Sequence, residues 1–344
     1  MSLSKNKREE IRVYICERLA REGSDGLVES VSQTFDLTGS SVYRLIREMI
    51  ADGILLRDGR RLTFQEDTHS WTFQRSDVWF EQDNIFYSSC ILPLIRDLPE
   101  NVRQIWDYGF TEIMNNAIDH SRTERLDVTY KRNFHSTSIA IRDYGDGIFR
   151  HIQSACGFPT LEDALAELYK GKLTTDETRH SGEGIFFTSR GMDLFVAAAN
   201  GLEFSHNKFD EMKIQALTGQ LMDVDSAGTL VYMSLSNTSK KSMKEIFDRY
   251  TNENFEFTKT SIPIANIYGF PVSRSQANRL LNRIEDFEEV VLDFTGIEAV
   301  GQGFADQIFR IYKRDHPDIK IVTVGTNETV DNMIRHVTKN SFVN

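Results

Sequence analysis

The sequence has few cysteines and no long apolar run. Its three cysteines, Cys16, Cys90 and Cys156, are too few and too scattered for a disulfide framework or a zinc site. No stretch approaches the roughly eighteen consecutive apolar residues that a membrane-spanning helix needs. The first residues are polar and lack the apolar segment of a secretory signal. We therefore expect a cytoplasmic protein that does not span a membrane.

An excess of positive charge is also absent, because the formal net charge is -11. This balance argues against a protein that coats nucleic acid non-specifically. The charge is uneven along the chain. Residues 1–65 contain eleven Lys and Arg against ten Asp and Glu, or +1, which leaves -12 for the rest. A near-neutral N-terminal region can therefore still present a local basic face.

Residues 1–65 predict three helices followed by a β-hairpin. Apolar residues recur at helical spacing in the first helix, as in Ile11, Ile15 and Leu19. Asp58-Gly59 lies between two short apolar runs and is a typical hairpin turn. The order resembles a winged helix-turn-helix domain, a family in which the third helix enters the DNA major groove.

The resemblance implies double-stranded DNA as a partner. The candidate DNA-binding residues lie on the polar face of the third helix and on the hairpin, or wing. They are Ser40, Ser41, Tyr43, Arg44 and Arg47 on the helix, and Arg57, Arg60 and Arg61 on the wing. The alternative is a small helical domain used for dimerisation or protein contact.

A polar helix face in the next region has the residue types that Mg²⁺-nucleotide chemistry needs. Residues 66–80 predict a polar connector, and a helix is expected from about 102 to 120. Glu112, Asn116 and Asp119 are spaced i, i+4 and i+7, so they share one face of it. Mg²⁺ prefers hard oxygen ligands, and a nearby glutamate can take a proton from an attacking water.

Three further motifs follow this helix. A strand expected over residues 136–142 runs into Asp143-Tyr144-Gly145-Asp146-Gly147, where the aspartate can accept a hydrogen bond from an exocyclic amine and the glycines allow close backbone approach. Ser181-Gly182-Glu183-Gly184 then precedes an apolar helix expected over 186–199, a suitable site for phosphate. Finally, Gly228-Thr229 precedes a strand expected over 230–235.

In this order the four motifs resemble the successive boxes of the gyrase/Hsp90/histidine-kinase/mismatch-repair (GHKL) ATPases, across about 150 residues. The resemblance implies the Bergerat α/β sandwich, with Mg²⁺ and ATP bound. It implies Glu112 as the general base, Asn116 as the Mg²⁺ ligand and Asp119 in support. The remaining implied contacts are Asp143 with the adenine amino group, Thr229 beside it, and Gly145, Gly147, Gly182 and Gly184 shaping the pocket.

Residues 255–344 alternate strands with helices, which predicts a parallel or mixed sheet. The segment LDFTGIEAVG at 292–301, followed by a helix, resembles a STAS domain, the anti-sigma-antagonist fold. Antagonists of that family carry a phosphorylatable serine at this turn, where this chain has Val300-Gly301-Gln302-Gly303. We therefore expect a docking or dimerisation domain rather than a phosphorylated switch.

The sequence thus predicts a multidomain α/β protein. Its expected parts are a winged helix at 1–65, a connector at 66–80, a GHKL domain at 81–240 and a STAS-like domain at 255–344. We expect a nucleotide-switched regulator that binds DNA. Two alternatives stay open, a serine/threonine kinase of the anti-sigma type and an ATP sensor with little turnover. A protein partner for the STAS-like region and a homodimer are both compatible with this architecture.

Overall fold

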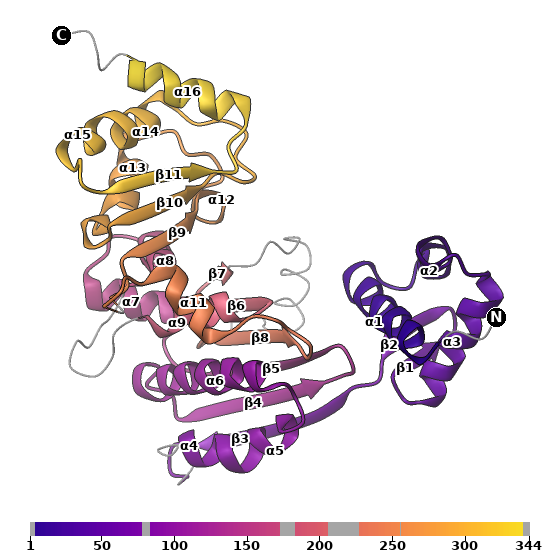
Figure 1. Cartoon of the computed structure of the whole chain (residues 1–344). Coiled ribbons are helices and arrows are strands. Elements are labelled where there is room, and N and C mark those ends of the chain that lie inside the picture. The colour runs from indigo at the N-terminus through magenta and orange to yellow at the C-terminus, as the bar shows by residue number, and fades with distance from the viewer. Residues whose placement is uncertain (1–3, 78–82, 173–182, 206–226, 255, 340–344) are drawn as a thin grey trace.

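Three β-sheets organise the part of the chain that the structure describes (Figure 1). The structure is a computed structural model, and it describes residues 4–77, 83–172, 183–205, 227–254 and 256–339. Helices accompany each sheet, so the chain is a mixed α/β protein. Within these ranges no helix combines the length and the apolar character needed to cross a membrane.

The N-terminal domain contains the predicted three helices and hairpin. These are α1 (Lys5–Glu22), α2 (Leu27–Phe35), α3 (Gly39–Ala51), β1 (Leu55–Asp58) and β2 (Arg61–Phe64). Thr38 caps α3 by accepting a hydrogen bond from the Ser41 amide at 3.3 Å. Asp58 pairs with Arg61, so the hairpin turn is Gly59–Arg60, one residue later than expected. The domain has an apolar core of its own, separate from the rest of the molecule.

The middle of the chain is built on a six-stranded antiparallel sheet. Its spatial order is β3-β4-β5-β8-β6-β7. The strands are β3 (Asp67–Gln74), β4 (Arg125–Arg132), β5 (Ser136–Asp143), β6 (Leu194–Ala199), β7 (Leu202–Ser205) and β8 (Leu230–Ser236). Ile139 and Ile141 of β5 are fully buried while their neighbours are only half-buried, so helices cover one face of the sheet.

The expected connector at 66–80 is wrong for residues 67–74, because these form β3 at the edge of this sheet. Every residue of β3 pairs with β4, from Asp67 opposite Arg132 to Gln74 opposite Arg125. Phe73 is buried and Trp71 packs against the core, while Ser70, Thr72 and Gln74, which alternate with them, are polar and exposed. Because one face of this edge strand is exposed to solvent, its sequence has the polar composition of a linker.

The apolar helix expected over 186–199 is also wrong. The chain forms α9 (Gly184–Gly191) and then enters β6, which pairs with β7 through a two-residue turn at Asn200 and Gly201. Both turn residues have positive φ, 54° and 77°, as a type I′ turn requires. Since β6 is almost entirely buried, it has no alternating pattern to distinguish it from a buried helix.

The middle domain has several further helices beside the helix α6 (Glu100–His120), which packs on β5 and α9. They are α4 (Asp83–Phe86), the π-helical turn η2 (Tyr87–Ile91), α5 (Leu92–Ile95), α7 (Ile148–Cys156), α8 (Leu161–Lys170) and α11 (Met243–Tyr250). The expected α6 is confirmed and begins two residues earlier than predicted.

The C-terminal domain contains a parallel three-stranded sheet, as the alternating pattern predicts. The order is β11-β10-β9, and both strand pairs are parallel. Its elements are β9 (Lys259–Pro263), α12 (Ile264–Ile267), α13 (Arg274–Leu281), η3 (Ile284–Asp286), β10 (Glu289–Asp293), α14 (Gln302–Asp306), η4 (Gln307–Tyr312), α15 (Lys313–Asp315), β11 (Lys320–Val324) and α16 (Glu328–Lys339).

One continuous apolar core runs through the middle and C-terminal domains. Phe257 joins them, with ring centroids 4.6 Å from Phe186 on α9 and 5.3 Å from Phe287 in the C-terminal domain. Helix α8 packs on β9 and α13. The C-terminal domain is therefore fused to the middle domain through a shared core, whereas the N-terminal domain has its own.

Candidate nucleotide-binding site

Helix α6 presents the three polar residues that the sequence places on one face. Glu112 and Asn116 are half-buried and Asp119 is exposed. The helix is unbroken over 21 residues, so the i, i+4, i+7 spacing puts these side chains in one row. The opposite stripe, which includes Phe110, Ile113 and Met114, is buried in the core.

Gly184, the first residue of α9, lies directly against Glu112. A Cβ atom on Gly184 would overlap Oε2 of Glu112 and lie 2.8 Å from its Cδ. The same two helices meet closely at Gly109, where a Cβ would lie 3.0 Å from Cγ2 of Thr188. The glycine-rich turn and the candidate base are therefore neighbours. Gly182, the other glycine of that turn, lies outside the described residues.

Asp143 is held at the end of β5 by backbone amides. Its side chain is 4 % exposed, and Oδ1 accepts hydrogen bonds from the amides of Gly145 at 2.9 Å and Thr229 at 3.1 Å. Burial raises the pKa of Asp143, and these hydrogen bonds oppose that rise. An ionised carboxylate has about four lone-pair positions, so acceptor capacity remains for a ligand amine.

Thr229 is tied to the same turn. Its carbonyl accepts a hydrogen bond from the Asp143 amide at 3.0 Å, and its hydroxyl accepts one from Ile148 at the start of α7, also at 3.0 Å. The same hydroxyl also hydrogen-bonds the Asp143 carboxylate, which opposes the rise in the pKa of Asp143. The preceding residue, Gly228, has φ 95° and packs on the backbone of Asp143 and Tyr144. The Gly-Thr motif is therefore adjacent to Asp143, as predicted.

The glycines after Asp143 are required by close contacts. A Cβ on Gly145 would overlap the carbonyl of Ser121, the residue that follows α6. Gly147 has φ 86°, and a Cβ there would lie 2.8 Å from Cγ of Asn200. Since Gly145 touches the end of α6 and Gly184 touches its middle, both motifs pack on the helix that carries Glu112 and Asn116.

Two residues near this cluster were not predicted. Asn200 donates a hydrogen bond to the Asp146 carbonyl at 3.0 Å and accepts one from the Arg150 amide at 3.2 Å, which fixes the β5–α7 turn. Its Asn-Gly pair is a hairpin signal, hidden by the helix expected there. Glu183 is the second: burial raises its pKa, and the charge of Glu112 adds to that rise. The signal for Glu183 was its place between two glycines.

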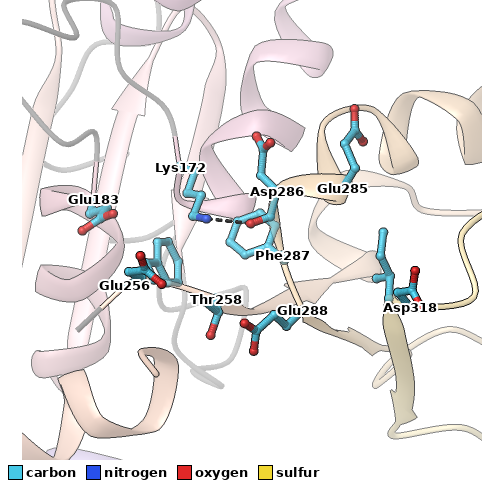
Figure 2. A pocket seen from close by; sticks show the side chains of 11 residues that line it. Lys172, Glu183, Glu256, Thr258, Glu285, Asp286, Phe287, Glu288 and Asp318 are labelled. Atoms are coloured by element: carbon cyan, nitrogen blue, oxygen red, sulfur yellow. Dashed lines mark hydrogen bonds between the residues drawn. The ribbon is translucent and has the colours of Figure 1, made fainter. Parts of the chain in front are cut away.

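An acidic pocket of about 620 Å³ lies between α9 and the C-terminal domain (Figure 2). Its charged lining residues are Lys172, Glu183, Glu256, Glu285, Asp286, Glu288 and Asp318. Glu112, Asn116 and Asp143 do not line it. Six carboxylates against one ammonium disfavour a triphosphate, so this pocket is not a suitable site for ATP.

The predicted DNA-binding residues lie together at the surface of the N-terminal domain. All are exposed except Ser41, which is half-buried, and Tyr43 is 49 % exposed. The domain's other arginines form ion pairs, Arg8 with Glu48, Arg12 with Asp52, and Arg18 and Arg21 with Glu22. In the described part of the chain none of the arginines on α3 or the wing does so, and these are Arg44, Arg47, Arg57, Arg60 and Arg61.

The comparison with protein families concerns the C-terminal domain. Residues 276–331 match the family described as "STAS-like domain of unknown function (DUF4325)". The C-terminal domain is STAS-like. The match begins within α13 and ends within α16, so it covers β10 and β11 and none of the candidate nucleotide-site residues. A search of curated proteins found no match.

The STAS-like domain is tightly packed at the turn where antagonists of the STAS family carry a phosphorylatable serine. The Gly301 amide donates a hydrogen bond to the Pro271 carbonyl at 2.9 Å. A Cβ on Gly301 would lie 2.6 Å from Cα of Val272. A larger residue at position 301 would therefore displace the neighbouring loop.

Proposed function

We propose that this chain binds Mg²⁺-ATP against α6 and uses the nucleotide to switch a regulator that binds DNA through its N-terminal domain. The observation that carries the proposal is the convergence of three separate motifs on one helix. Gly184 contacts Glu112 in the middle of α6, and Gly145 contacts Ser121 at its end. Thr229 is hydrogen-bonded to Asp143 in the same turn as Gly145.

The roles follow from the chemistry of each side chain. The Asn116 carbonyl oxygen is a hard ligand suited to Mg²⁺, which keeps several of its waters. Asp143 accepts a hydrogen bond from the adenine amino group, with Thr229 beside it. The amides at the start of α9 bind phosphate oxygens, and Gly184 leaves room beside them for the Glu112 carboxylate. Asp119, one turn beyond Asn116 and exposed, orients water around the metal.

Glu112 is the candidate general base. It lies one turn before Asn116, so a water near the metal-bound phosphate is within reach of its carboxylate. Glu183 provides a second carboxylate nearby, whose pKa is raised by burial and by the charge of Glu112. The order of the motifs resembles that of the GHKL ATPases, which supports hydrolysis as the reaction.

The arginines of α3 and the wing support the DNA-binding half of the proposal. Surface arginines commonly form ion pairs with neighbouring carboxylates, as Arg8 and Arg12 do, and each such pair changes the free energy of folding little. Among the described residues no carboxylate pairs with the arginines of α3 and the wing, which keeps a local positive field on a chain of net charge -11. Such a field suits phosphate contacts from the wing and base contacts from α3.

Coupling between the two halves requires that ATP bind one conformation of the chain more tightly than another. The N-terminal domain has a separate core, and its β2 strand leads directly into β3 of the nucleotide-binding sheet. Phe64 of β2 stacks on His135, next to β5, with centroids 6.1 Å apart. A change in the sheet can therefore reach the DNA-binding domain through this junction.

The deciding experiment follows γ-labelled ATP with Mg²⁺ on the full chain, beside the variants Glu112→Gln and Glu124→Gln. Glu124 is an exposed glutamate just after α6 and serves as the matched control. We expect free phosphate from the wild type and from Glu124→Gln, and a loss of at least about a hundredfold in Glu112→Gln. Equilibrium binding of ATP should persist in all three proteins.

The other outcomes are distinct. Label that stays on protein, lost in Glu112→Gln, would replace hydrolysis by protein kinase activity. Tight binding without any turnover would leave an ATP sensor. Absence of ATP binding by the wild type in the presence of Mg²⁺ would refute the nucleotide site itself.

A further inference from the structure

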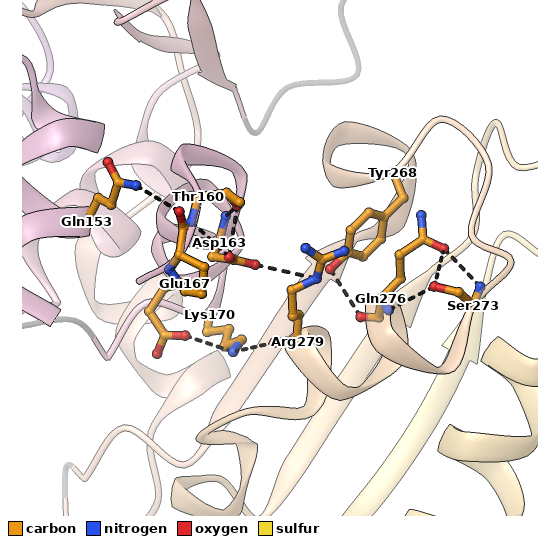
Figure 3. Close-up of polar contacts among 10 residues, drawn as sticks. Gln153, Thr160, Asp163, Glu167, Lys170, Tyr268, Ser273, Gln276 and Arg279 are labelled. Atoms are coloured by element: carbon orange, nitrogen blue, oxygen red, sulfur yellow. Dashed lines mark hydrogen bonds and ion pairs between the residues drawn. The ribbon is translucent and has the colours of Figure 1, made fainter. Parts of the chain in front are cut away.

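The STAS-like domain is anchored to the middle domain by a buried ammonium group. Lys170, the last residue of α8, is 1 % exposed, and its Nζ lies 2.8 Å from Oε2 of Glu167, which is 3 % exposed (Figure 3). The same Nζ donates hydrogen bonds to the carbonyls of Asn282 and, at 3.4 Å, Arg279, at the end of α13. An ammonium there complements the helix dipole. Glu167 and Lys170 both belong to α8, so separating the domains would keep their ion pair and would break the hydrogen bonds from Lys170 to the two carbonyls of the STAS-like domain.

The chain just after Lys170 is held by the same domain. Thr260 of β9 donates a hydrogen bond from its hydroxyl to the Lys170 carbonyl at 2.8 Å, and Lys172 donates to the Asp286 carbonyl at 2.6 Å. Gly171, between them, has φ 93° and packs on the ring of Phe186, where a Cβ would lie 2.7 Å from Cγ. Phe186 belongs to α9, so the STAS-like domain fixes a segment that contacts α9.

Helix α9 is also tied directly to the STAS-like sheet through Arg190. Its Nη2 donates a hydrogen bond to the Ser261 carbonyl of β9 at 3.0 Å. The guanidinium carbon lies 4.3 Å from the ring centroid of Phe186 and 5.4 Å from that of Tyr250. Burial lowers the pKa of Arg190 to about 10, so the group stays charged at neutral pH.

The burial of this charge is costly for the number of hydrogen bonds it makes. The Nε and Nη1 atoms of Arg190 are buried, and neither has a hydrogen-bond partner in the described part of the chain. The guanidinium contacts one carbonyl, the hydroxyl and ring of Tyr250 and the ring of Phe186, and it has no carboxylate partner in the described part of the chain, so its burial does not favour stability. Arg190 instead has a structural role between the domains, because it connects the end of α9 to β9.

The other end of α9 is the candidate nucleotide site. Arg190 is the seventh residue of this eight-residue helix and Gly184 is the first. A helix of this length behaves as one short rod, so a shift at Arg190 moves Gly184 against Glu112. At Gly191 a Cβ would lie 3.1 Å from Ile105 of α6, so the two helices are in close contact along their length.

We propose that Arg190 is a positioning residue, through which the STAS-like domain sets the place of α9 against Glu112. The STAS-like domain then helps to position the nucleotide site, in addition to offering a surface for partners. This inference rests on the proposed function for its catalytic meaning. By linkage, a partner that moves β9 changes the affinity for ATP, and ATP changes the affinity for that partner by the same factor.

The test uses the full chain and the variants Arg190→Met, Arg190→Lys and Arg314→Met. Arg314 is 69 % exposed on α15, pairs with Asp315 and is the matched control. Hydrogen–deuterium exchange is measured without nucleotide, and ATP binding is measured separately. In Arg190→Met we expect exchange in residues 184–191 to rise at least about tenfold and ATP affinity to fall by a similar factor. Exchange in α1–α3 should not change.

Arg190→Lys keeps the positive charge and one nitrogen that can donate to Ser261. Its exchange in residues 184–191 and its ATP affinity should therefore lie between those of Arg190→Met and the wild type. If Arg190→Met does not fold, Arg190→Lys alone provides the test. Unchanged exchange in residues 184–191 would refute the positioning role, whether or not ATP binds. Faster exchange there with unaltered ATP affinity would refute the link to the nucleotide site. If the wild type binds no ATP while exchange in residues 184–191 still rises in Arg190→Met, the proposed function is refuted and the role of Arg190 in positioning α9 is supported.

Discussion

Gly184 and Glu112 are in such close contact that no side chain fits between them. A Cβ on Gly184 would overlap Oε2 of Glu112 and come within 3.3 Å of its Cβ. Gly184 does not have a positive φ, so its identity is explained by this contact and not by backbone conformation. The contact joins two motifs that are 72 positions apart in the sequence.

Gly184→Ala should therefore impair turnover more than folding. The added methyl group must displace the Glu112 carboxylate, and we expect ATP turnover to fall at least about tenfold with a smaller change in ATP affinity. The gain in helix propensity, up to about 1 kcal/mol, offsets the crowding, so the melting temperature should change little. Gly269→Ala is the control, since a Cβ there meets nothing within 4 Å. Equal turnover in both variants would contradict the assignment of Glu112.

Asp143→Asn should separate adenine recognition from folding. Asparagine Oδ1 can still accept the hydrogen bonds of Gly145 and Thr229, and the buried charge is removed. Because burial raises the pKa of Asp143, the ionised carboxylate costs stability as the pH rises through its folded value, so the variant should be at least as stable at neutral pH.

The affinity of Asp143→Asn for ATP should fall by about 10- to 100-fold, because an amide group would face the adenine amine in place of an acceptor. Purine riboside triphosphate lacks that amine and provides the control ligand. Its affinity should be similar for both proteins. A loss of affinity for both nucleotides alike would indicate a structural role for Asp143.

The sequence predicted those parts of the molecule whose signal is local. Helix α6, expected from about 102 to 120, is such a part, because its apolar and polar stripes recur at helical spacing. The turn at Asp143 was recognised because aspartate and glycine have few other uses at the end of a strand. Glu112, Asn116 and Asp119 lie on one face because helical spacing fixes it.

What the sequence could not predict depends on contacts between distant residues. β3 was missed because its identity as a strand comes from pairing with β4, more than fifty residues later. β6 was missed because a fully buried apolar run has no alternation. The sequence gives no sign of the role of Arg190, since a cation within an expected helix is common. Only the position of β9 shows that Arg190 makes a contact between the domains.

The junction between the N-terminal domain and the sheet should be sensitive to pH. Burial lowers the pKa of His135 below its ordinary value of 6.5, and the charges of Glu17 and Asp193 only partly oppose this. The neutral ring stacks on Phe64. Since the folded pKa is depressed, the stability that His135 contributes is present above pH 6.5 and is lost as the pH falls through the folded value.

His135→Gln should therefore lose less thermal stability than the wild type when the pH is lowered from 7.5 to 5. The measurement is the difference in melting temperature between these two conditions for each protein. His336→Gln, an exposed histidine on α16, is the control and should behave as the wild type does. The same difference in melting temperature in all three proteins would show that protonation of His135 does not affect the stability of this junction.

The arginines of the wing give the sharpest test of DNA binding. Arg57, Arg60 and Arg61 are exposed, and the described residues offer none of them an ion pair. Each phosphate contact releases condensed counterions and adds about 0.9 to the slope of log Kd against log salt concentration. Replacing all three by glutamine should therefore lower the slope measured with random-sequence duplex DNA by up to about 2.7.

The matched control for the wing is Arg21→Gln on α1, where Arg21 is 69 % exposed and pairs with Glu22. It removes one positive charge from the same domain without touching α3 or the wing. A slope that falls by a similar amount per charge in both variants would mean that DNA senses only net charge. An unchanged slope in the wing variant would mean that this surface makes no phosphate contacts, and the N-terminal domain would then be a protein-contact domain.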